Sequence, residues 1–212
     1  MSLLEFWIRN KKQLEDRQFR VGNVVFHIPY DRETRTYLNF KCQKCGHCCT
    51  VPRGLPLTFQ DIRRLMIKLG YSSVDKFLSE ECVYGVISME TVYPLNIPAK
   101  MLTWNLKRFK DETEDDLMIP HRCRFLKNGL CTIYDVRPMV CRKYPFYEFK
   151  AGGIVHAAYT SEEKSKCKGF FASRKFKPKL YVQFSKWLEQ GWYEVVESLE
   201  YGLSHLIEPF VY

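Results

Sequence analysis

The most distinctive stretch of this sequence is Cys42-Gln43-Lys44-Cys45-Gly46-His47-Cys48-Cys49. Cys42, Cys45 and Cys48 follow one another with two residues between each pair. This spacing allows a tight turn to direct successive sulfurs inward while backbone amides donate to them, and Gly46 suits the turn because glycine tolerates positive φ. Thiolate is a soft ligand that suits zinc, cuprous copper and iron–sulfur clusters. The stretch therefore predicts a metal site.

The spacing within the run favours iron–sulfur over zinc. Three closely spaced cysteines with a remote fourth are typical of ferredoxin four-iron clusters, whereas zinc sites more often use separated pairs of ligands. We expect Cys42, Cys45 and Cys48 to hold a four-iron cluster together with one distant cysteine. Cys49 directly follows Cys48, and adjacent side chains are expected to diverge. Cys49 is therefore expected to serve a second metal or to support the first.

Cysteines further along the chain supply the remaining ligands that such sites need. They are Cys123, Cys131, Cys141 and Cys167, and with the run they make eight cysteines, enough for two four-cysteine sites or for one cluster and one zinc. In a regular hairpin turning at Asn128-Gly129, Cys123 and Cys131 would face opposite sides, so one of them must leave the strand if both bind one metal. Cys82 stands apart, and we expect it to be a half-buried structural thiol.

Other polar residues near the cysteines have two interpretations each. The nearby histidines are His47, His121 and His156. Each is either a ligand in place of a thiolate, which would raise the potential of a cluster, or a supporting polar residue. The cationic residues around Cys141 are Arg137, Arg142 and Lys143. They either stabilise thiolates or form surface pairs with Asp135 and Glu148.

Periodicity and capping signals predict an α+β fold. Capping boxes at Ser2 and Thr58 and a start at Ser73 predict helices, and Asn128-Gly129 and Gly152-Gly153 predict hairpin turns. The expected helices cover residues 3–18, 58–70, 73–80 and a stretch from Leu180 to Gly191, with another helix from Trp192 to Leu206. The expected strands cover 21–28 and 36–41, the hairpins cover 124–134 and 147–159, and 83–109 is irregular or stranded. Cysteine-bearing loops and hairpins should form the centre of a single domain with helices at both ends. We divide it into residues 1–37, a metal-binding part at 38–170, and a C-terminal helical extension at 171–212.

Composition places the chain among ordinary globular proteins, with 46% hydrophobic and 27% charged residues. No run is long and apolar enough for a spanning helix, and the N-terminus lacks the basic-then-apolar order of a signal peptide. We therefore predict a cytoplasmic location. Thiols are kept reduced there, which favours ligands over disulfides for the nine cysteines.

The formal net charge of +9 is unevenly spread. Residues 164–179 carry seven basic side chains and no acidic ones, and residues 111–116 carry five acids. Such blocks are usually solvated faces. The basic stretch also permits nucleic-acid binding, with Phe170, Phe171 and Phe176 available for stacking on bases.

The downstream cysteines stand in a distinctive context. The sequence there is Cys123-x-Phe125-Leu126, followed by Cys131-x-Ile133-Tyr134-x-x-Arg137-Pro138-x-x-Cys141-Arg142-x-Tyr144-Pro145-Phe146. Together with the run at 42–49, this pattern resembles the YkgJ-like cysteine-cluster family, known as a putative zinc- or iron-chelating domain. The resemblance covers residues 38–170, including Leu57-Thr58-x-x-Asp61-Ile62 and Cys167-x-Gly169.

The resemblance implies a set of metal ligands without specifying the metal. The set is Cys42, Cys45, Cys48, Cys49, Cys123, Cys131, Cys141 and Cys167. Flagellin lysine N-methylase is similar in its cysteine region, which would imply methyl transfer to protein lysine. This chain shows neither a glycine-rich methyl-donor loop nor the Cys-x-x-x-Cys-x-x-Cys spacing of radical enzymes, and both absences count against that activity.

Four functional hypotheses follow. The first is an iron–sulfur protein with a [4Fe-4S] cluster in a redox or uncharacterised enzymatic role, acting with an unidentified protein or redox partner. The second is a structural zinc protein, and the third is a cluster-containing protein lysine methyltransferase. The fourth is a nucleic-acid-binding module that uses Lys164–Lys179. We favour the first of these.

Overall fold

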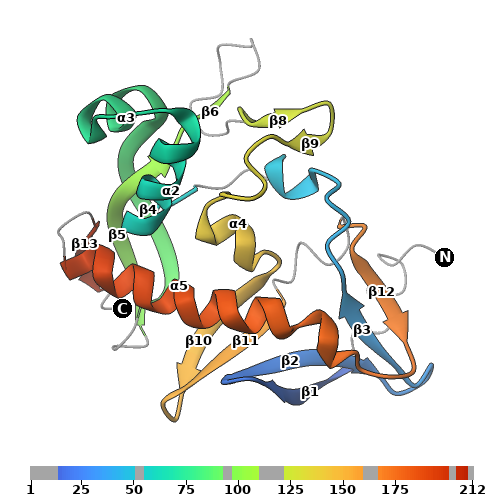
Figure 1. The fold of residues 1–212 in the computed structure, drawn as a ribbon. Coiled ribbons are helices and arrows are strands. Elements are labelled where there is room, and N and C mark those ends of the chain that lie inside the picture. Colours follow the sequence, from blue (N-terminus) through green and yellow to red (C-terminus); the bar gives the residue numbers. More distant parts are fainter. Residues whose placement is uncertain are drawn as a thin grey trace, which may run out of the picture. The chain divides into compact units, whose positions relative to one another are not determined.

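The computed structural model of this protein describes residues 14–50, 55–92, 97–109, 122–159, 167–200 and 204–209. It confirms the α+β class, with α-helices and several β-sheets along the chain (Figure 1). The chain divides into two compact units, each built from two separate segments. The first comprises Met1–Cys45 and Lys143–Gln190, and the second comprises Gly46–Arg142 and Gly191–Tyr212. The predicted boundaries 1–37, 38–170 and 171–212 stay a prediction.

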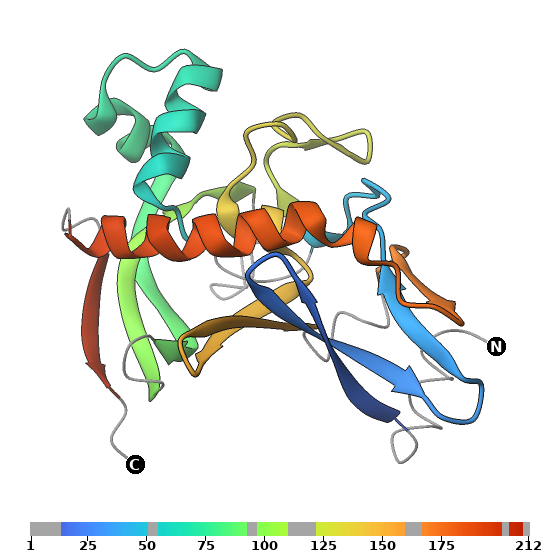
Figure 2. The ribbon, with the colours of Figure 1, turned by 60° about the horizontal axis from the view of Figure 1, so that its bottom comes forward.

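The first unit is built on a six-stranded mixed sheet. Its strands are β1 (Leu14–Val21), β2 (Val24–Asp31), β3 (Thr36–Phe40), β10 (Phe146–Ala151), β11 (Ile154–Tyr159) and β12 (Phe170–Ser173). The order is β10-β11-β2-β3-β12, with β1 paired to β2. Neighbours are antiparallel except β11 and β2, which are parallel. Figure 2 shows β1 and β2 crossing as a twisted ribbon.

Aromatic side chains form the core of the first unit. Phe146 lies 4.8 Å from Tyr159 and 5.3 Å from Phe26 between ring centroids. The hydroxyls of Tyr159 and Tyr181 are 2.6 Å apart, and the Tyr181 hydroxyl also accepts from the Phe40 amide at 3.0 Å. Tyr181 follows the short 3-10 turn η2 (Pro178–Leu180) and precedes α5 (Val182–Glu200). Hydrogen bonds therefore satisfy the hydroxyls of both tyrosines within this aromatic core.

The second unit combines helices with short sheets. Its helices are α2 (Phe59–Leu69), α3 (Val74–Glu81), α4 (Met139–Lys143, whose last residue belongs to the first unit) and the part of α5 from Gly191 onward. Strands β13 (Ser204–Pro209), β5 (Ile97–Leu106) and β4 (Cys82–Val92) form one sheet in that order (Figure 2). Two small ribbons pair β6 (Arg108–Phe109) with β7 (Arg122–Cys123) and β8 (Leu126–Lys127) with β9 (Leu130–Cys131).

Local signals in the sequence placed the middle helices and both hairpins correctly. Thr58 and Asp61 form the predicted capping box of α2, and Gly70 ends that helix with a φ of 78°. Ser73 caps α3. Asn128 and Gly129, with φ values of 50° and 75°, turn the β8–β9 hairpin. Gly152 and Gly153 do the same for β10–β11, because turns with two positive φ values match the twist of paired strands.

The N-terminal helix prediction was wrong where the structure tests it, whereas the strand expected over 36–41 is confirmed as β3. The helix expected over 3–18 is contradicted at residues 14–18, which belong to β1; residues 3–13 lie outside the described residues. The strand expected over 21–28 is present as β2 from Val24 onward, but Gly22 at φ 61° turns β1 into β2 before it, and β2 continues through Pro29. Pairing of β1 along the whole of β2 overrides the weak helical periodicity.

The C-terminal helix prediction was wrong at Gly191. The helix α5 runs through Gly191 without a break, and Leu206 lies in β13 rather than in a helix. An interior glycine costs a helix only about 1 kcal/mol relative to alanine, which packing of a long helix outweighs. The stretch 83–109, which the sequence predicted only as irregular or stranded, forms β4, β5 and β6 wherever it is described. Among the described helices, none is long and apolar enough to cross a membrane.

Candidate metal centre

The cysteine run forms the predicted tight turn. Lys44 and Gly46 both have positive φ, 54° and 72°. The Lys44 amide donates to Cys42 Sγ at 3.4 Å. The Cys49 amide donates to the Gly46 carbonyl at 2.9 Å, closing the 3-10 turn η1 (His47–Cys49).

Three thiols of the second unit meet the thiol of Cys49. The buried Cys49 thiol lies within hydrogen-bonding reach of the sulfurs of Cys48, Cys123 and Cys131. Cys48 and Cys49 are therefore not divergent, contrary to the expectation from their adjacency in the sequence. We call these four residues the thiol cluster.

Proton sharing within the thiol cluster is unequal. Hydrogen bonds to Cys123, Cys131 and Cys48 raise the pKa of Cys49 far above the ordinary range of a thiol, and burial raises it further. The hydrogen bond from Cys49 lowers the pKa of Cys131, and the Ile133 amide also favours its thiolate. Cys131 therefore loses its proton more readily than Cys49.

Cys123 reaches the thiol cluster because it lies outside the hairpin that carries Cys131. In the β8–β9 hairpin Leu126 pairs with Cys131, whereas Cys123 pairs with Arg108 in the separate β6–β7 ribbon. This satisfies the condition that one of these two cysteines must leave the hairpin if both are to bind one metal.

The thiol cluster is part of the core of the second unit. Cys49 and Cys123 are buried members of that core, and Cys48, Cys131 and Cys141 pack against it. Leu55, Leu65 and Phe77 contribute large apolar side chains to the same core. A dry setting of this kind strengthens electrostatic interactions at the sulfurs.

Cys82 belongs to the same core but has a different environment. Burial raises its pKa to about 12, and the neighbouring Glu81 adds to the effect. Cys82 is only 4% exposed, more deeply buried than the half-buried position expected from the sequence. Its surroundings stabilise the neutral thiol, in keeping with a structural role.

The remaining cysteines belong to the first unit. Cys42 and Cys45 are exposed, whereas Cys167 is buried. Within the described part of the chain, no group of three or more His, Cys, Asp or Glu side chains has the arrangement of a finished ion site. This agrees with the geometry of the thiol cluster, in which three sulfurs hydrogen-bond to Cys49 instead of surrounding a common point. Metal binding there requires loss of protons and a shift of the Cys49 sulfur.

The cationic residues after Cys131 were expected either to stabilise thiolates or to form surface ion pairs, and their contacts differ. Lys143 forms an ion pair with Glu148, as the surface-pair interpretation has it. Arg142 donates to the carbonyl of Arg137 at 2.8 Å, and Arg137 lies 3.9 Å over the Tyr134 ring. Burial, followed by the charge of Arg64, lowers the pKa of Arg142. Arg137 precedes the helix that carries Cys141, and Arg142 lies within it.

The histidines of the described chain lie in different places. His47 begins η1 next to Cys48. His156 in β11 lies 2.9 Å from His27 in β2, between ring nitrogens. Burial, followed by the proximity of His156, lowers the pKa of His27. His121 lies outside the described residues.

Two of the three phenylalanines in the basic stretch are engaged in packing. Phe170 is buried against Phe40, and Phe176 stacks on Phe19 with 4.1 Å between centroids. Phe171 is half-buried, with the Lys177 ammonium 5.5 Å from its ring centre. Nucleic-acid binding through this stretch stays a prediction.

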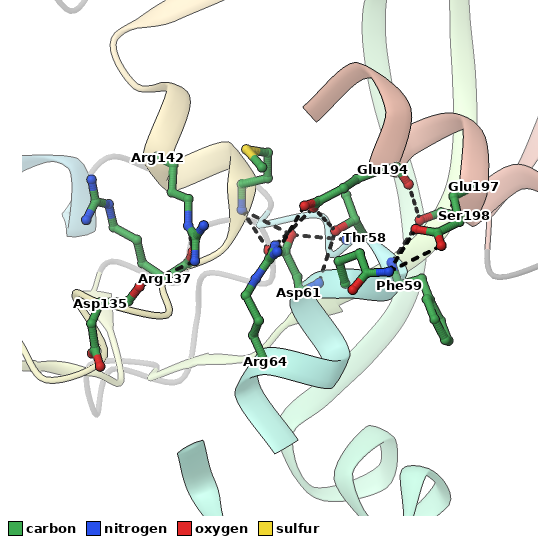
Figure 3. Close-up of polar contacts among 12 residues, drawn as sticks. Thr58, Phe59, Asp61, Arg64, Asp135, Arg137, Arg142, Glu194, Glu197 and Ser198 are labelled. Carbon is green, nitrogen blue, oxygen red and sulfur yellow. Dashed lines mark hydrogen bonds and ion pairs between the residues drawn. The ribbon is translucent and has the colours of Figure 1, made fainter. Parts of the chain in front are cut away.

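A buried charged network that reaches the start of α4 was missed by sequence reasoning (Figure 3). Asp61 is fully buried and accepts from Arg64 at 2.6 Å. Arg64 also donates to both carboxylate oxygens of Glu194, each at 2.9 Å. The capping box identified Asp61, and Arg64 stands three residues later on the same face of α2. Glu194 comes from α5, and nothing in the local sequence indicates that it meets Arg64.

Comparison with known proteins identifies a family. No curated protein and no solved structure matches the chain. A family model described as a putative zinc- or iron-chelating domain, CxxCxxCC, matches residues 41–168. The match spans the cysteine run, the thiol cluster and Cys141, and its description agrees with the soft ligands found there. By its sequence this chain belongs to the CxxCxxCC family of zinc- or iron-chelating domains.

Proposed function

We propose that this protein binds a metal ion through the thiolates of Cys48, Cys49, Cys123 and Cys131. The observation that supports the proposal is the contact of the Cys49 thiol with the other three sulfurs. Four thiols meet in one apolar core, although their residues come from the cysteine run, β7 and β9. Four cysteine sulfurs are the ligand set of structural zinc sites and also suit iron.

The size of the thiol cluster favours a single ion. A zinc–sulfur bond of about 2.3 Å places neighbouring ligands of a tetrahedral site about 3.8 Å apart. The three sulfurs within hydrogen-bonding reach of Cys49 are already near that separation from the Cys49 sulfur. A four-iron cluster interposes a cube of iron and sulfide, so the same four sulfurs would have to move much further apart.

An iron–sulfur cluster held by Cys42, Cys45 and Cys48 is the second candidate. The support for it is the ferredoxin-like spacing of the run and the amide of Lys44 donating to Cys42 Sγ. Such a cluster would give the protein a redox role, since iron–sulfur centres exchange single electrons with partners. The two candidates share Cys48 and differ in every other cysteine named.

Metal and sulfide analysis of anaerobically purified protein tests the proposal. One equivalent of zinc or iron per chain without acid-labile sulfide supports a single-ion site. Iron with a matching amount of sulfide supports the cluster instead. Protein that contains neither metal, and that takes up neither on anaerobic reconstitution, refutes metal binding.

Serine variants assign the ligands. We expect Cys49→Ser and Cys123→Ser to lose the metal while Cys45→Ser keeps it. Loss of iron in Cys45→Ser with full retention in Cys49→Ser would overturn the single-ion site and support the cluster. Cys82→Ser is the matched control, because Cys82 lies in the same core but outside the thiol cluster.

A further inference from the structure

Asp61 joins the beginning of α2 to the beginning of α4. Its two carboxylate oxygens each lie 3.0 Å from the Met139 amide, and Met139 is the first residue of α4. One oxygen also accepts from the Thr58 amide at 3.1 Å. A carboxylate at the N-terminus of a helix satisfies amides that have no partner within the helix. Asp61 therefore accepts hydrogen bonds from amides at the N-termini of two helices, α2 and α4.

A second pair of charges holds Asp61 in place. Arg64 contacts Asp61 and binds Glu194 of α5 in a bidentate pair, and the Thr58 hydroxyl donates to Glu194 at 2.8 Å (Figure 3). Asp61 is 0% and Glu194 4% exposed. Burial raises the pKa of Asp61, and the charge of Arg64 opposes that rise. Removing one member of such a buried group leaves an uncompensated charge.

The helix α4 depends on this anchor for its position. It spans five residues, Met139–Lys143, and so short a helix is not stable by itself. Cys141 lies two residues after Met139, and its amide donates to the Pro138 carbonyl at 2.9 Å. Cys141 packs against the core that contains the thiol cluster. The backbone that presents Cys141 is therefore fixed from one side by Asp61.

We infer that Asp61 is a positioning residue for Cys141 and that Cys141 contributes to metal retention. The Arg64–Glu194 pair orients the Asp61 carboxylate, so the network acts on the metal centre without touching it. This inference rests on the proposed function, because it gives Cys141 a part in the same centre. Residues that orient metal ligands from outside typically change metal affinity 10- to 100-fold when they are substituted.

A double-mutant cycle tests the inference. We expect Cys141→Ser and Asp61→Ala each to speed transfer of the bound metal to a chelator at least tenfold. The double variant should be no faster than Cys141→Ser, because Asp61 acts only through Cys141. The absorption spectrum of the Co²⁺-loaded protein provides a second readout, since a change in the arrangement of the thiolates around the metal alters its sulfur-to-metal band.

Two further variants separate positioning from general loss of stability. Asp61→Asn keeps an oxygen for the Met139 amide but loses the charge that faces Arg64. Its rate of metal transfer to the chelator should therefore lie between those of the wild type and Asp61→Ala. This variant also replaces Asp61→Ala in the test if the alanine variant does not fold. Phe77→Leu, in α3 of the same core, lowers stability without touching the network and should leave the Co²⁺ spectrum unchanged.

The outcomes are distinguishable from failure of the proposed function. Wild-type release rates in folded Asp61→Asn or in Cys141→Ser, or additive effects in the cycle, would overturn the inference while leaving the metal centre intact. A wild-type protein that retains no metal, or whose metal content survives Cys49→Ser and Cys123→Ser, would overturn the proposed function itself.

Discussion

At the scale of single residues, two buried cysteines of the second unit have opposite surroundings. Cys49 hydrogen-bonds to three other thiols, whereas burial and Glu81 hold Cys82 as a neutral thiol. We predict that Cys49→Ser lowers the metal content at least tenfold and that Cys82→Ser leaves it unchanged. The buried hydroxyl of Cys82→Ser should instead lower the free energy of unfolding by about 1–3 kcal/mol. Metal analysis and denaturant titration of both variants check this.

Tyr181 is the central hydrogen-bonding residue in the core of the first unit. Its hydroxyl accepts from the Phe40 amide, and the Tyr159 hydroxyl contacts the Leu38 carbonyl at 3.3 Å. Tyr181→Phe leaves a buried amide unsatisfied, which should lower the free energy of unfolding by about 1–3 kcal/mol. Tyr159→Phe should have the smaller effect, because its bond to Leu38 is long. Denaturant titration ranks the two, and an equal or reversed order would contradict this interpretation.

The same two tyrosines predict how stability changes at alkaline pH. Burial raises the pKa of Tyr181 to about 12 and that of Tyr159 above its ordinary value of 10.0. The folded state therefore keeps protons that the unfolded chain loses above pH 10, so stability falls as the pH rises beyond that point. The expected slope is about 1.4 kcal/mol per pH unit for each phenol. The free energy of unfolding of the Tyr159→Phe/Tyr181→Phe variant, measured from pH 9 to 11, should decline less steeply than that of the wild type.

At the scale of elements, the turn in the cysteine run depends on Gly46. A Cβ at Gly46 would lie 2.7 Å from Leu126 Cδ1 and 2.9 Å from the Gly129 carbonyl oxygen. Gly70 has a similar φ of 78° but open space around it. Both alanine variants carry the left-handed penalty of about 1–2 kcal/mol, and crowding adds about 1–3 kcal/mol at Gly46.

We therefore predict that Gly46→Ala lowers the free energy of unfolding by about 2 kcal/mol more than Gly70→Ala. Gly46→Ala should also release metal faster, because η1 carries Cys48 and Cys49. Thermal unfolding and chelator transfer of both variants test this. Equal effects of the two substitutions would show that the contacts of Gly46 do not matter.

At the scale of the whole molecule, a metal in the thiol cluster links parts of the second unit that are distant in sequence. Binding to the folded state alone stabilises a protein by about 2.7 kcal/mol at a ligand concentration 100 times the dissociation constant. We predict that a strong chelator lowers the melting temperature of the wild type by several degrees. Cys49→Ser should melt at the same temperature with and without the chelator. A melting temperature of the wild type that does not change on complete metal removal would contradict this stabilising role of the metal.

The sequence by itself determined the chemistry and the local geometry. The cysteine run predicted soft-metal binding and a tight turn, and the structure has positive φ at Lys44 and Gly46 with an amide bonded to Cys42 Sγ. Caps and turns were predictable because each depends on residues fewer than five apart. The N-terminal helix failed at residues 14–18 because long-range pairing of β1 with β2 decides that segment.

Only the tertiary structure decided which groups meet. Cys49 lies beside Cys123 and Cys131, and Arg64 binds Glu194, although more than seventy residues separate the members of each pairing. No local rule fixes such contacts, because they depend on how every intervening element packs. The set of candidate thiol ligands could therefore be predicted from the sequence. Their grouping around Cys49, and the buried carboxylate that holds α4, came from the packing of distant segments into one core.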